Sequence, residues 1–221
     1  MSWTHGPGLL LWMGTAALVA AATVAAILTW TRGSRRAAGW IALGLAAWLF
    51  AYGALLAAVS LASDERMLAR GETKWFCGVY LDCHMGVAVH GVRTADVLGE
   101  GDSALRANGR FWIVSLAVEN SAVRAPLRLY VPEARVADAT GRSWDRAPAA
   151  ERVLAGEPAD LTREVPPGGS YVVELVYDLP EEVSDPRLLV IEKGLPERLA
   201  ERVLIGDEDS LLHAPTTLRI S

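Results

Sequence analysis

Two long stretches without charged residues open the chain. Residues 8–30 and 37–62 contain no Asp, Glu, Lys, Arg or His. An α-helix needs about 20 apolar residues to cross the hydrocarbon core of a bilayer. Each stretch is long enough, so the pattern predicts a transmembrane helical hairpin over residues 1–63. Because neither stretch holds an ionisable side chain, we do not expect this chain alone to be a transporter or a pump.

The short loop between the two stretches sets the expected orientation. Residues 31–36 contain Arg32, Arg35 and Arg36, whereas the segment before the first stretch has no Lys or Arg. Short loops rich in Lys and Arg stay in the cytoplasm. We therefore expect a cytoplasmic loop at 31–36, with the N-terminus and everything after residue 63 on the extracytoplasmic side of the cell membrane.

A cleaved signal peptide is the alternative interpretation of the first stretch. Signal peptides have a basic N-terminal region and an apolar core of about 7–15 residues. Here the N-terminal region is neutral and the apolar stretch is longer, which favours an anchor. The many Gly and Ala residues of the second stretch allow close helix packing, either within the hairpin or against another membrane subunit.

From Trp75 onward the hydrophobic pattern alternates with a period of two. In residues 110–120, every second residue from Trp112 to Val118 is apolar and shares one face. Seven or so short strands between Gly, Pro and Asp turns predict an all-β, immunoglobulin-like antiparallel sandwich over residues 75–221. Residues 64–74 are expected to be a linker that begins by continuing the second helix.

The individual elements follow from the same pattern. Strands are expected at 86–92, 110–120, 127–131, 170–179, 187–193, 203–206 and 216–220, and two short strand pieces are expected within 134–145, on either side of a turn from Asp138 to Gly141. Local helical patterns are expected near 150–155 and 195–203. The fold class is therefore mixed, a two-helix transmembrane hairpin followed by a β-sandwich.

Three motifs occur in a fixed order within the β-rich region. A hydrophobic strand ends in Asn, an Asp-x-x-Gly-x-x-aromatic turn follows, and a Pro-Gly turn precedes a strand that ends in Asp-hydrophobic-Pro. The motif residues are Asn120, then Asp138, Gly141 and Trp144, then Pro167, Gly168, Asp178 and Pro180. Over residues 84–192 the chain resembles a bacterial extracytoplasmic family of membrane-anchored telokin-like, immunoglobulin-like domains. The resemblance implies this sandwich fold and a role in binding rather than catalysis.

The chain has two cysteines, Cys77 and Cys83. Outside the cytoplasm, two cysteines this close together indicate a disulfide. In one continuous strand they would lie about 20 Å apart, which is beyond the reach of a bridge. A disulfide therefore requires a bend between them, which Gly78 or Asp82 can supply.

The same segment supports an alternative, a copper-binding or thiol-redox site. Its candidate ligands are soft or borderline side chains together with two more distant histidines: Cys77, Cys83, His84, Met85, His90 and His213. Neighbouring residues of a strand point to opposite faces, which argues against one ion bound by both His84 and Met85. We therefore expect no cofactor, with copper as the alternative.

The net charge of the β-rich region and the absence of known catalytic motifs narrow the functions expected of this chain. All 26 acidic residues lie at Asp64 or later, and three of the 21 basic residues precede it, so residues 64–221 carry a net charge of −8. Such a domain repels nucleic acid. The sequence has no nucleophile elbow, zinc-protease motif, Walker loop or dinucleotide fingerprint. We expect a non-enzymatic binding module, an accessory to another membrane or envelope protein, and we expect the acidic run at 207–209 to be a solvated turn.

Overall fold

The computed structural model describes residues 5–77, 83–192, 201–208 and 210–221. The chain divides into two compact units. The first, called the hairpin unit, combines Met1–Asp64 with Pro196–Ala214; the second, called the sandwich unit, combines Glu65–Leu195 with Pro215–Ser221. This division differs from the expected boundaries, which assigned every residue after 74 to the β domain.

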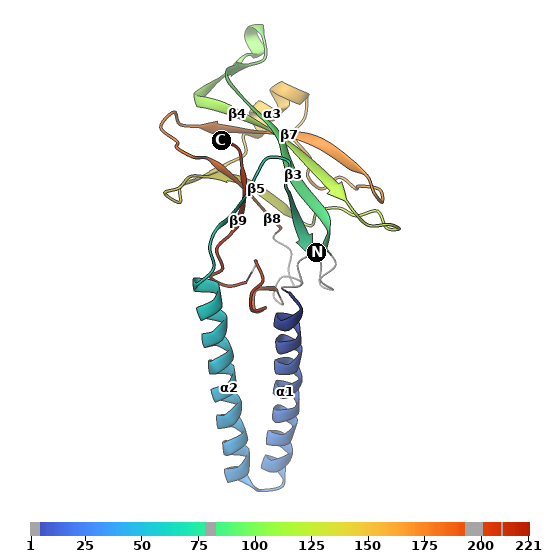
Figure 1. Cartoon of the computed structure of the whole chain (residues 1–221), viewed down its shortest axis with the longest axis vertical. Helices are drawn as coiled ribbons and strands as arrows, with labels where there is room; N and C mark the ends of the chain where they lie inside the picture. The colour runs from blue at the N-terminus through green and yellow to red at the C-terminus, as the bar shows by residue number, and fades with distance from the viewer. Residues whose placement is uncertain (1–4, 78–82, 193–200, 209) are drawn as a thin grey trace. The chain divides into compact units, whose positions relative to one another are not determined.

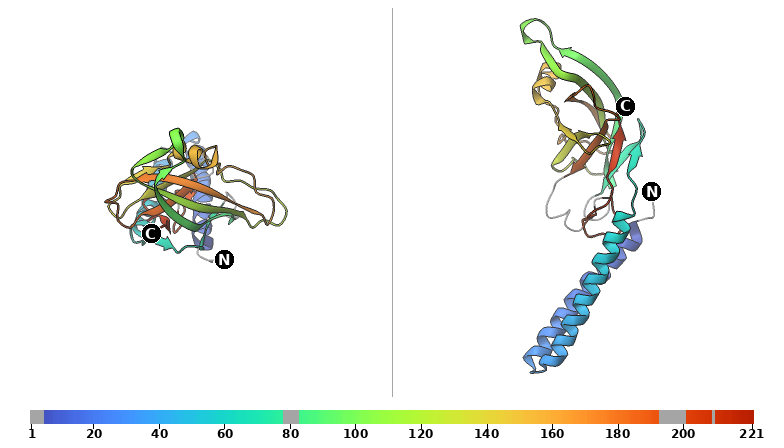
Figure 2. Two further views of the ribbon diagram at one scale, coloured as in Figure 1. Left: turned by 90° about the horizontal axis from the view of Figure 1, so that it is seen from above. Right: turned by 90° about the vertical axis from the view of Figure 1, so that its left-hand side faces the viewer.

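The hairpin unit is built on two helices, α1 (His5–Thr31) and α2 (Arg35–Leu61), of 27 residues each. They run side by side and are joined by a tight turn in which Gly33 adopts a φ of 86° (Figures 1 and 2). Both are long and apolar enough to cross a membrane, and only 6% of each apolar window is buried inside the protein. Their apolar side chains therefore face outward, unlike those of a core helix in a soluble domain.

The two helices contact each other through small and polar side chains. Trp48 Nε1 donates a hydrogen bond to Thr15 Oγ1 across the hairpin at 3.3 Å, and Thr15 is buried there. Hydrogen bonds of this kind hold apolar helices together where hydrophobic attraction between them is weak. The second helix ends at Leu61, so the expected helical extension into residues 63–74 is wrong.

Two stretches from the C-terminal region, residues 201–208 and 210–214, pack on the helices within the hairpin unit. Tyr52 Oη donates to the carbonyl of Val203 at 2.6 Å, and the hydroxyls of Ser60 and Ser210 lie 3.1 Å apart. The amide of Ala214 donates to Ser63 Oγ at 2.8 Å. These bonds fasten the two stretches along the last three turns of α2.

Helix α1 contacts the first of these stretches at a glycine. A Cβ atom on Gly8 would lie 2.3 Å from the carbonyl oxygen of Ile205, so only glycine allows this approach. The strand expected at 203–206 is wrong, because these residues form turns in which Leu204 is buried. A short apolar run has the same pattern in a strand and in a buried turn. Asp207 is also buried, not solvated as expected, and Asp209 lies outside the described residues.

The sandwich unit contains two sheets (Figures 1 and 2). One has the strand order β2-β3-β4-β7, and the other β1-β9-β8-β5-β6. The strands of the first sheet are β2 (Thr73–Cys77), β3 (Cys83–Leu98), β4 (Leu105–Asn120) and β7 (Ser170–Leu179). Those of the second are β1 (Arg66–Leu68), β5 (Pro132–Ala137), β6 (Ser143–Asp145), β8 (Arg187–Glu192) and β9 (Thr216–Arg219).

The core lies between the facing sides of the two sheets. Val114, Leu116 and Val118 of β4 are fully buried in it, as their alternation predicts. Leu188 and Val190 of β8 contribute from the second sheet. Two sheets that pack face to face around one core form a β-sandwich, so the predicted sandwich is confirmed.

A short helix, α3 (Pro148–Ala155), packs on the outer face of the first sheet. It begins with a proline, which suits the first helical turn, and Gly156 ends it in the left-handed conformation with a φ of 85°. Its Ala150 covers Ile113 and Val176 in a second, smaller apolar cluster. The helical pattern expected near 150–155 is therefore confirmed.

Two further expectations for this unit are wrong. Residues 127–131 form no strand; an isolated bridge joins Leu127 to Val165. The expected linker 64–74 contains β1, which pairs in parallel with β9, and the start of β2. Both differences come from pairing between distant segments, which local periodicity does not reveal. The helix expected at 195–203 falls mostly outside the described residues.

Candidate functional site

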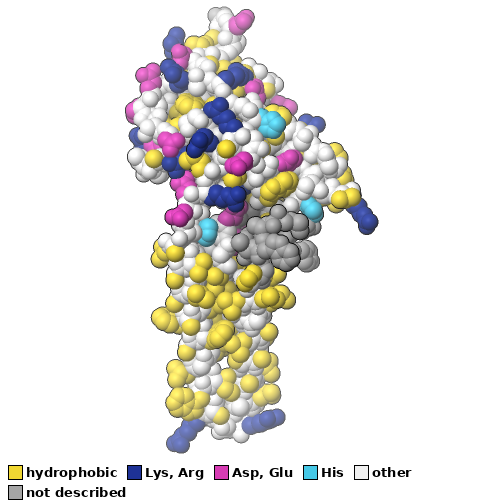
Figure 3. All heavy atoms as spheres, in the orientation of Figure 1, with side chains coloured by type: hydrophobic (Ala, Val, Ile, Leu, Met, Phe, Trp, Pro, Cys, Tyr) yellow, Lys and Arg dark blue, Asp and Glu magenta, His cyan; other side chains and the backbone are white. Residues whose placement is uncertain are grey.

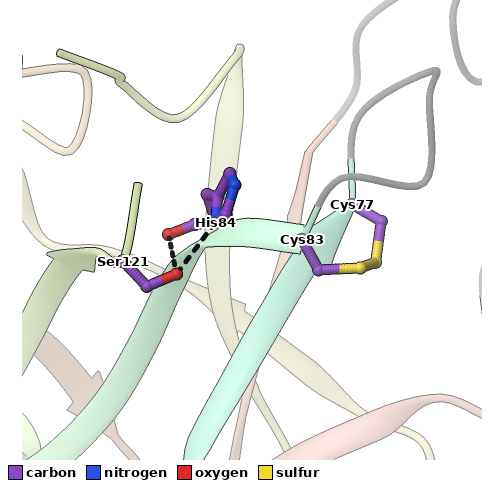
Figure 4. Close-up of a disulfide and its surroundings, with 4 residues drawn as sticks. All are labelled: Cys77, Cys83, His84 and Ser121. Atoms are coloured by element: carbon purple, nitrogen blue, oxygen red, sulfur yellow. Dashed lines mark hydrogen bonds between the residues drawn. A yellow bond between two sulfur atoms is a disulfide. The ribbon is translucent and has the colours of Figure 1, made fainter. Parts of the chain in front are cut away.

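The Cys77–Cys83 segment lies where β2 and β3 pair. The two cysteines are cross-strand partners in this antiparallel pair and are joined by a disulfide (Figure 4). The chain therefore reverses direction between them, as a bridge over this short separation requires. The bend expected at Gly78 or Asp82 falls on residues 78–82, outside the described part of the chain.

The other candidate ligands do not gather around the disulfide. His84 Nδ1 lies 3.1 Å from Ser121 Oγ, which also donates to the His84 carbonyl at 3.3 Å (Figure 4). The Ser121 amide donates to the same carbonyl at 2.9 Å. Met85 is a buried member of the sandwich core. His90 is exposed on β3, and His213 belongs to the hairpin unit, where its Nδ1 lies 2.8 Å from the Ala214 carbonyl.

This placement leaves the copper interpretation without an assembled site. Among the residues that the structure describes, no three His, Cys, Asp or Glu side chains are grouped so that they could hold a metal ion. The oxidised Cys77–Cys83 pair cannot supply thiolate ligands. Met85 faces the core, where its thioether fills space between the sheets.

A buried lysine beside the disulfide was not anticipated. Lys74 on β2 is only 4% exposed, and its Nζ donates to the carbonyl of Val190 in the opposite sheet at 3.1 Å. The same Nζ lies 5.3 Å from the centre of the Phe76 ring. Lys74 therefore ties the two sheets together. The sequence pattern indicated this burial, because Lys74 is two residues from the buried Phe76 on the same strand and therefore points to the same face.

The outer face of the first sheet is only partly covered. Helix α3 packs over Ile113 and Val176, and the part of this face nearer the disulfide lies outside that apolar cluster. This part, called the outer patch, consists of two adjacent rows in the strand register: Thr73, Ala88, Ala117 and Val172, and then Trp75, Gly86, Glu119 and Ser170.

Small residues make the outer patch flat. Trp75 is 39% exposed and lies over Gly86, where a Cβ would come within 3.0 Å of the indole ring. Val172, on the edge strand β7, is 59% exposed. Between them, Ala88 and Ala117 are only 3% and 6% exposed, so Trp75 and Val172 supply most of the exposed apolar surface of the patch. An aromatic ring and an exposed valine flanking a low apolar surface are features that protein interfaces share.

A shallow groove of about 470 Å³ lies elsewhere on this unit, lined by Trp144, Asp178, Glu181 and neighbouring residues. The Asp178 carboxylate in it is already engaged. It accepts hydrogen bonds from the Asn108 amide at 2.9 Å, from Asn108 Nδ2 at 2.7 Å and from the Gly109 amide at 3.2 Å. These bonds fix the β4 backbone against β7, so Asp178 has a structural role.

The other motif residues are structural as well. The buried Asn120 donates from Nδ2 to the carbonyls of Ala125 and Val165 and accepts from the Ala122 amide, which shapes the loop after β4. Asp138 accepts from Thr140 and Arg142 in the turn between β5 and β6. Burial raises the pKa of this carboxyl, but the hydrogen bonds outweigh that effect and lower it to about 2.

Comparison with known proteins finds solved structures of distant likeness. No protein-family model matches the chain, and no curated protein is significantly similar to it. A structure of the yjhA protein from Bacillus subtilis aligns with 69% of this chain and 98% of its own, at 15% identity and a TM-score of 0.45. The secreted protein MPT63 from Mycobacterium tuberculosis aligns over 62% and 95%, at 12% identity and a TM-score of 0.42. An uncharacterised β-sandwich protein from Clostridium difficile aligns over 61% and 91%, at 15% identity and a TM-score of 0.38.

Proposed function

We propose that the chain is a membrane-anchored, extracytoplasmic binding module of the telokin-like type, and that the outer patch binds another protein of the membrane or envelope. The observation that carries the proposal is a pair of exposed apolar side chains on the outer face of the first sheet, Trp75 and Val172, with the buried Ala88 and Ala117 between them. The polar groups of the motif residues Asn120, Asp138 and Asp178 are engaged in the fold, which is consistent with the proposed non-catalytic role.

The anchor supports a partner in the same membrane layer. Two helices of membrane-spanning length hold the sandwich unit close to the bilayer, and the arginine loop between them favours the cytoplasmic side. Tethering raises the effective concentration of a partner at the membrane, so a modest patch is sufficient for binding. The partner face is expected to be apolar at its centre, with basic residues around it that match the acidic domain.

The alternative proposal is a copper-binding or thiol-redox module that uses Cys77, Cys83, His84 and Met85. It requires the disulfide to be reduced first, since only thiolates bind the metal or attack another disulfide. The other two candidate ligands are His84, which lies beside Ser121, and Met85, which is buried in the core. Partner binding is the better supported of the two, because Trp75 and Val172 are already exposed whereas the copper site requires a reduced disulfide.

Site-specific photo-crosslinking in intact cells tests the outer patch. We expect p-benzoylphenylalanine in place of Trp75 to give a crosslinked product of one defined mass. Val172→Asp introduces a charge into the patch and is expected to abolish this product. Val123→Asp is the matched control, because Val123 is 86% exposed but lies outside the patch. A crosslink that survives Val172→Asp, or is lost equally with Val123→Asp, would contradict binding through this surface.

A further inference from the structure

The loop end of the hairpin unit combines an apolar groove with an uncompensated cationic turn. The groove has a volume of about 320 Å³ and lies between α1 and α2. Its lining includes Ile27 and Trp30 from α1 and Gly39 and Ala42 from α2, so its wall is almost wholly hydrocarbon. Within the bilayer, a groove of this kind must be filled by a side chain, another helix or a lipid chain.

The arginines stand directly beyond the groove. Arg32, Arg35 and Arg36 are exposed, and within the described part of the chain no carboxylate forms an ion pair with any of them. The space-filling view shows basic side chains gathered at the loop end of the helices, next to a surface that is otherwise apolar (Figure 3). A negatively charged group is therefore the expected counterpart at this level.

Trp30 connects the two features. Its indole lines the groove, and the guanidinium of Arg35 lies 5.6 Å from the ring centre. The ring thus belongs to the apolar wall and also fixes the position of a cation at the mouth of the groove. The first turn of α2 adds backbone donors, because Ser34 at its N-cap makes no side-chain capping bond.

We propose that this groove binds one anionic glycerophospholipid, with an acyl chain between α1 and α2 and the phosphate at Arg35 and Arg36. The choice of occupant follows from charge complementarity. A zwitterionic lipid would bring its own cation to a turn that already carries three, and a second apolar helix would leave the arginines without a counter-ion. The inference rests on the proposed membrane anchoring and is independent of the proposed partner binding.

Native mass spectrometry of the full chain in a non-ionic detergent tests this site. Palmitoyl-oleoyl phosphatidylglycerol and the corresponding phosphatidylcholine are added separately. We expect one phosphatidylglycerol to be retained about tenfold more tightly than phosphatidylcholine. The double variant Arg35→Gln with Arg36→Gln is expected to remove this preference. A variant with Arg106→Gln and Arg124→Gln is the control, because it removes two exposed charges of the sandwich unit.

A second pair of variants separates the groove from the charge. Gly39→Leu fills the groove and keeps every arginine, and it is expected to abolish the preference for phosphatidylglycerol. Gly53→Leu is the matched control, since both are exposed glycines of α2 with no atom within 4 Å of an added Cβ. Glycerol phosphate without acyl chains is expected not to compete for the site.

Several results would overturn the inference. Equal retention of the two lipids would show that the arginines do not select a headgroup. A preference that survives Gly39→Leu would mean that the charged turn acts without the groove. Competition by glycerol phosphate would indicate a soluble anion site, and a dimer that Gly39→Leu dissociates would assign the groove to a second helix. A chain that purifies without detergent would instead contradict the anchoring itself.

Discussion

Replacing Glu151 with alanine is expected to destabilise the sandwich unit by about 3–5 kcal/mol. Glu151 is 1% exposed, and its carboxylate accepts from Arg146 Nε at 2.9 Å and from Arg146 Nη2 at 2.6 Å. It also accepts from the amides of Ala159 and Val176. Removing the carboxylate takes the acceptor from four donor atoms, two of them in the largely buried Arg146 guanidinium, and leaves that charge without its counter-ion, which is costly.

The Arg146–Glu151 ion pair also affects the edge of the first sheet. Val176 lies on the edge strand β7, and Glu151 together with the Ala147 amide satisfies its outward amide and carbonyl groups. An edge strand with free backbone groups is a site for unwanted pairing. Besides losing stability, the Glu151→Ala protein is therefore expected to self-associate along β7.

Hydrogen exchange of the full chain, followed by mass spectrometry of β4 and β7 peptides, measures the loss. Protection is expected to fall by more than about 100-fold, since each 1.4 kcal/mol is a factor of ten. Arg152→Ala, an exposed neighbour on α3, is the control and should leave exchange almost unchanged. Combining Glu151→Leu with Arg146→Met should recover much of the protection. Unchanged exchange in Glu151→Ala would refute this role.

The disulfide is the second feature with a large expected effect. Replacing Cys77 and Cys83 by serine is expected to lower the free energy of unfolding by about 2 kcal/mol, because the bridge closes a loop with a sequence separation of only six residues. The loss should be concentrated at the β2–β3 end of the sheet. Peptides from β2 are therefore expected to lose protection before those from β8.

The same variant decides between the two proposed functions. In the oxidised full chain, mass spectrometry is expected to show a deficit of two hydrogens relative to the reduced chain and no uptake of added Cu(I). If the reduced wild-type chain retains one copper through gel filtration and the double serine variant does not, the copper-binding alternative is the correct one. His84→Ala in the reduced chain would then be expected to weaken retention.

Much of the architecture follows from local patterns in the sequence. The spans of α1 and α2 were predictable because a run of apolar residues has one stable form in a bilayer. The strands β4 and β7 were predictable because one face of each is buried, which imposes a period of two. The turn at Asp138 was predictable because an Asp side chain accepts hydrogen bonds from backbone amides of its own turn, and because Gly141 readily adopts the positive φ found there.

The remaining features depend on segments that meet only in the folded chain. Nothing local to Arg66 indicates that it pairs with Thr216, and nothing local to Val203 indicates that its carbonyl accepts from Tyr52. The candidate ligands were chosen by side-chain chemistry, but the register of β3 placed Met85 in the core. The outer patch could not be predicted, because it is defined by where α3 stops covering the sheet.

Cysteine accessibility in intact cells is the most direct test of an anchored chain with its sandwich outside the cytoplasm. The native cysteines form a disulfide, so single cysteines introduced at the exposed positions Ser34 and Ala139 provide the free thiols. With a membrane-impermeant maleimide, Ala139→Cys is expected to react in intact cells and Ser34→Cys only after permeabilisation, with both proteins in the membrane fraction. Labelling of Ser34→Cys but not Ala139→Cys in intact cells, or a shortened soluble protein that has lost the hairpin, would contradict it.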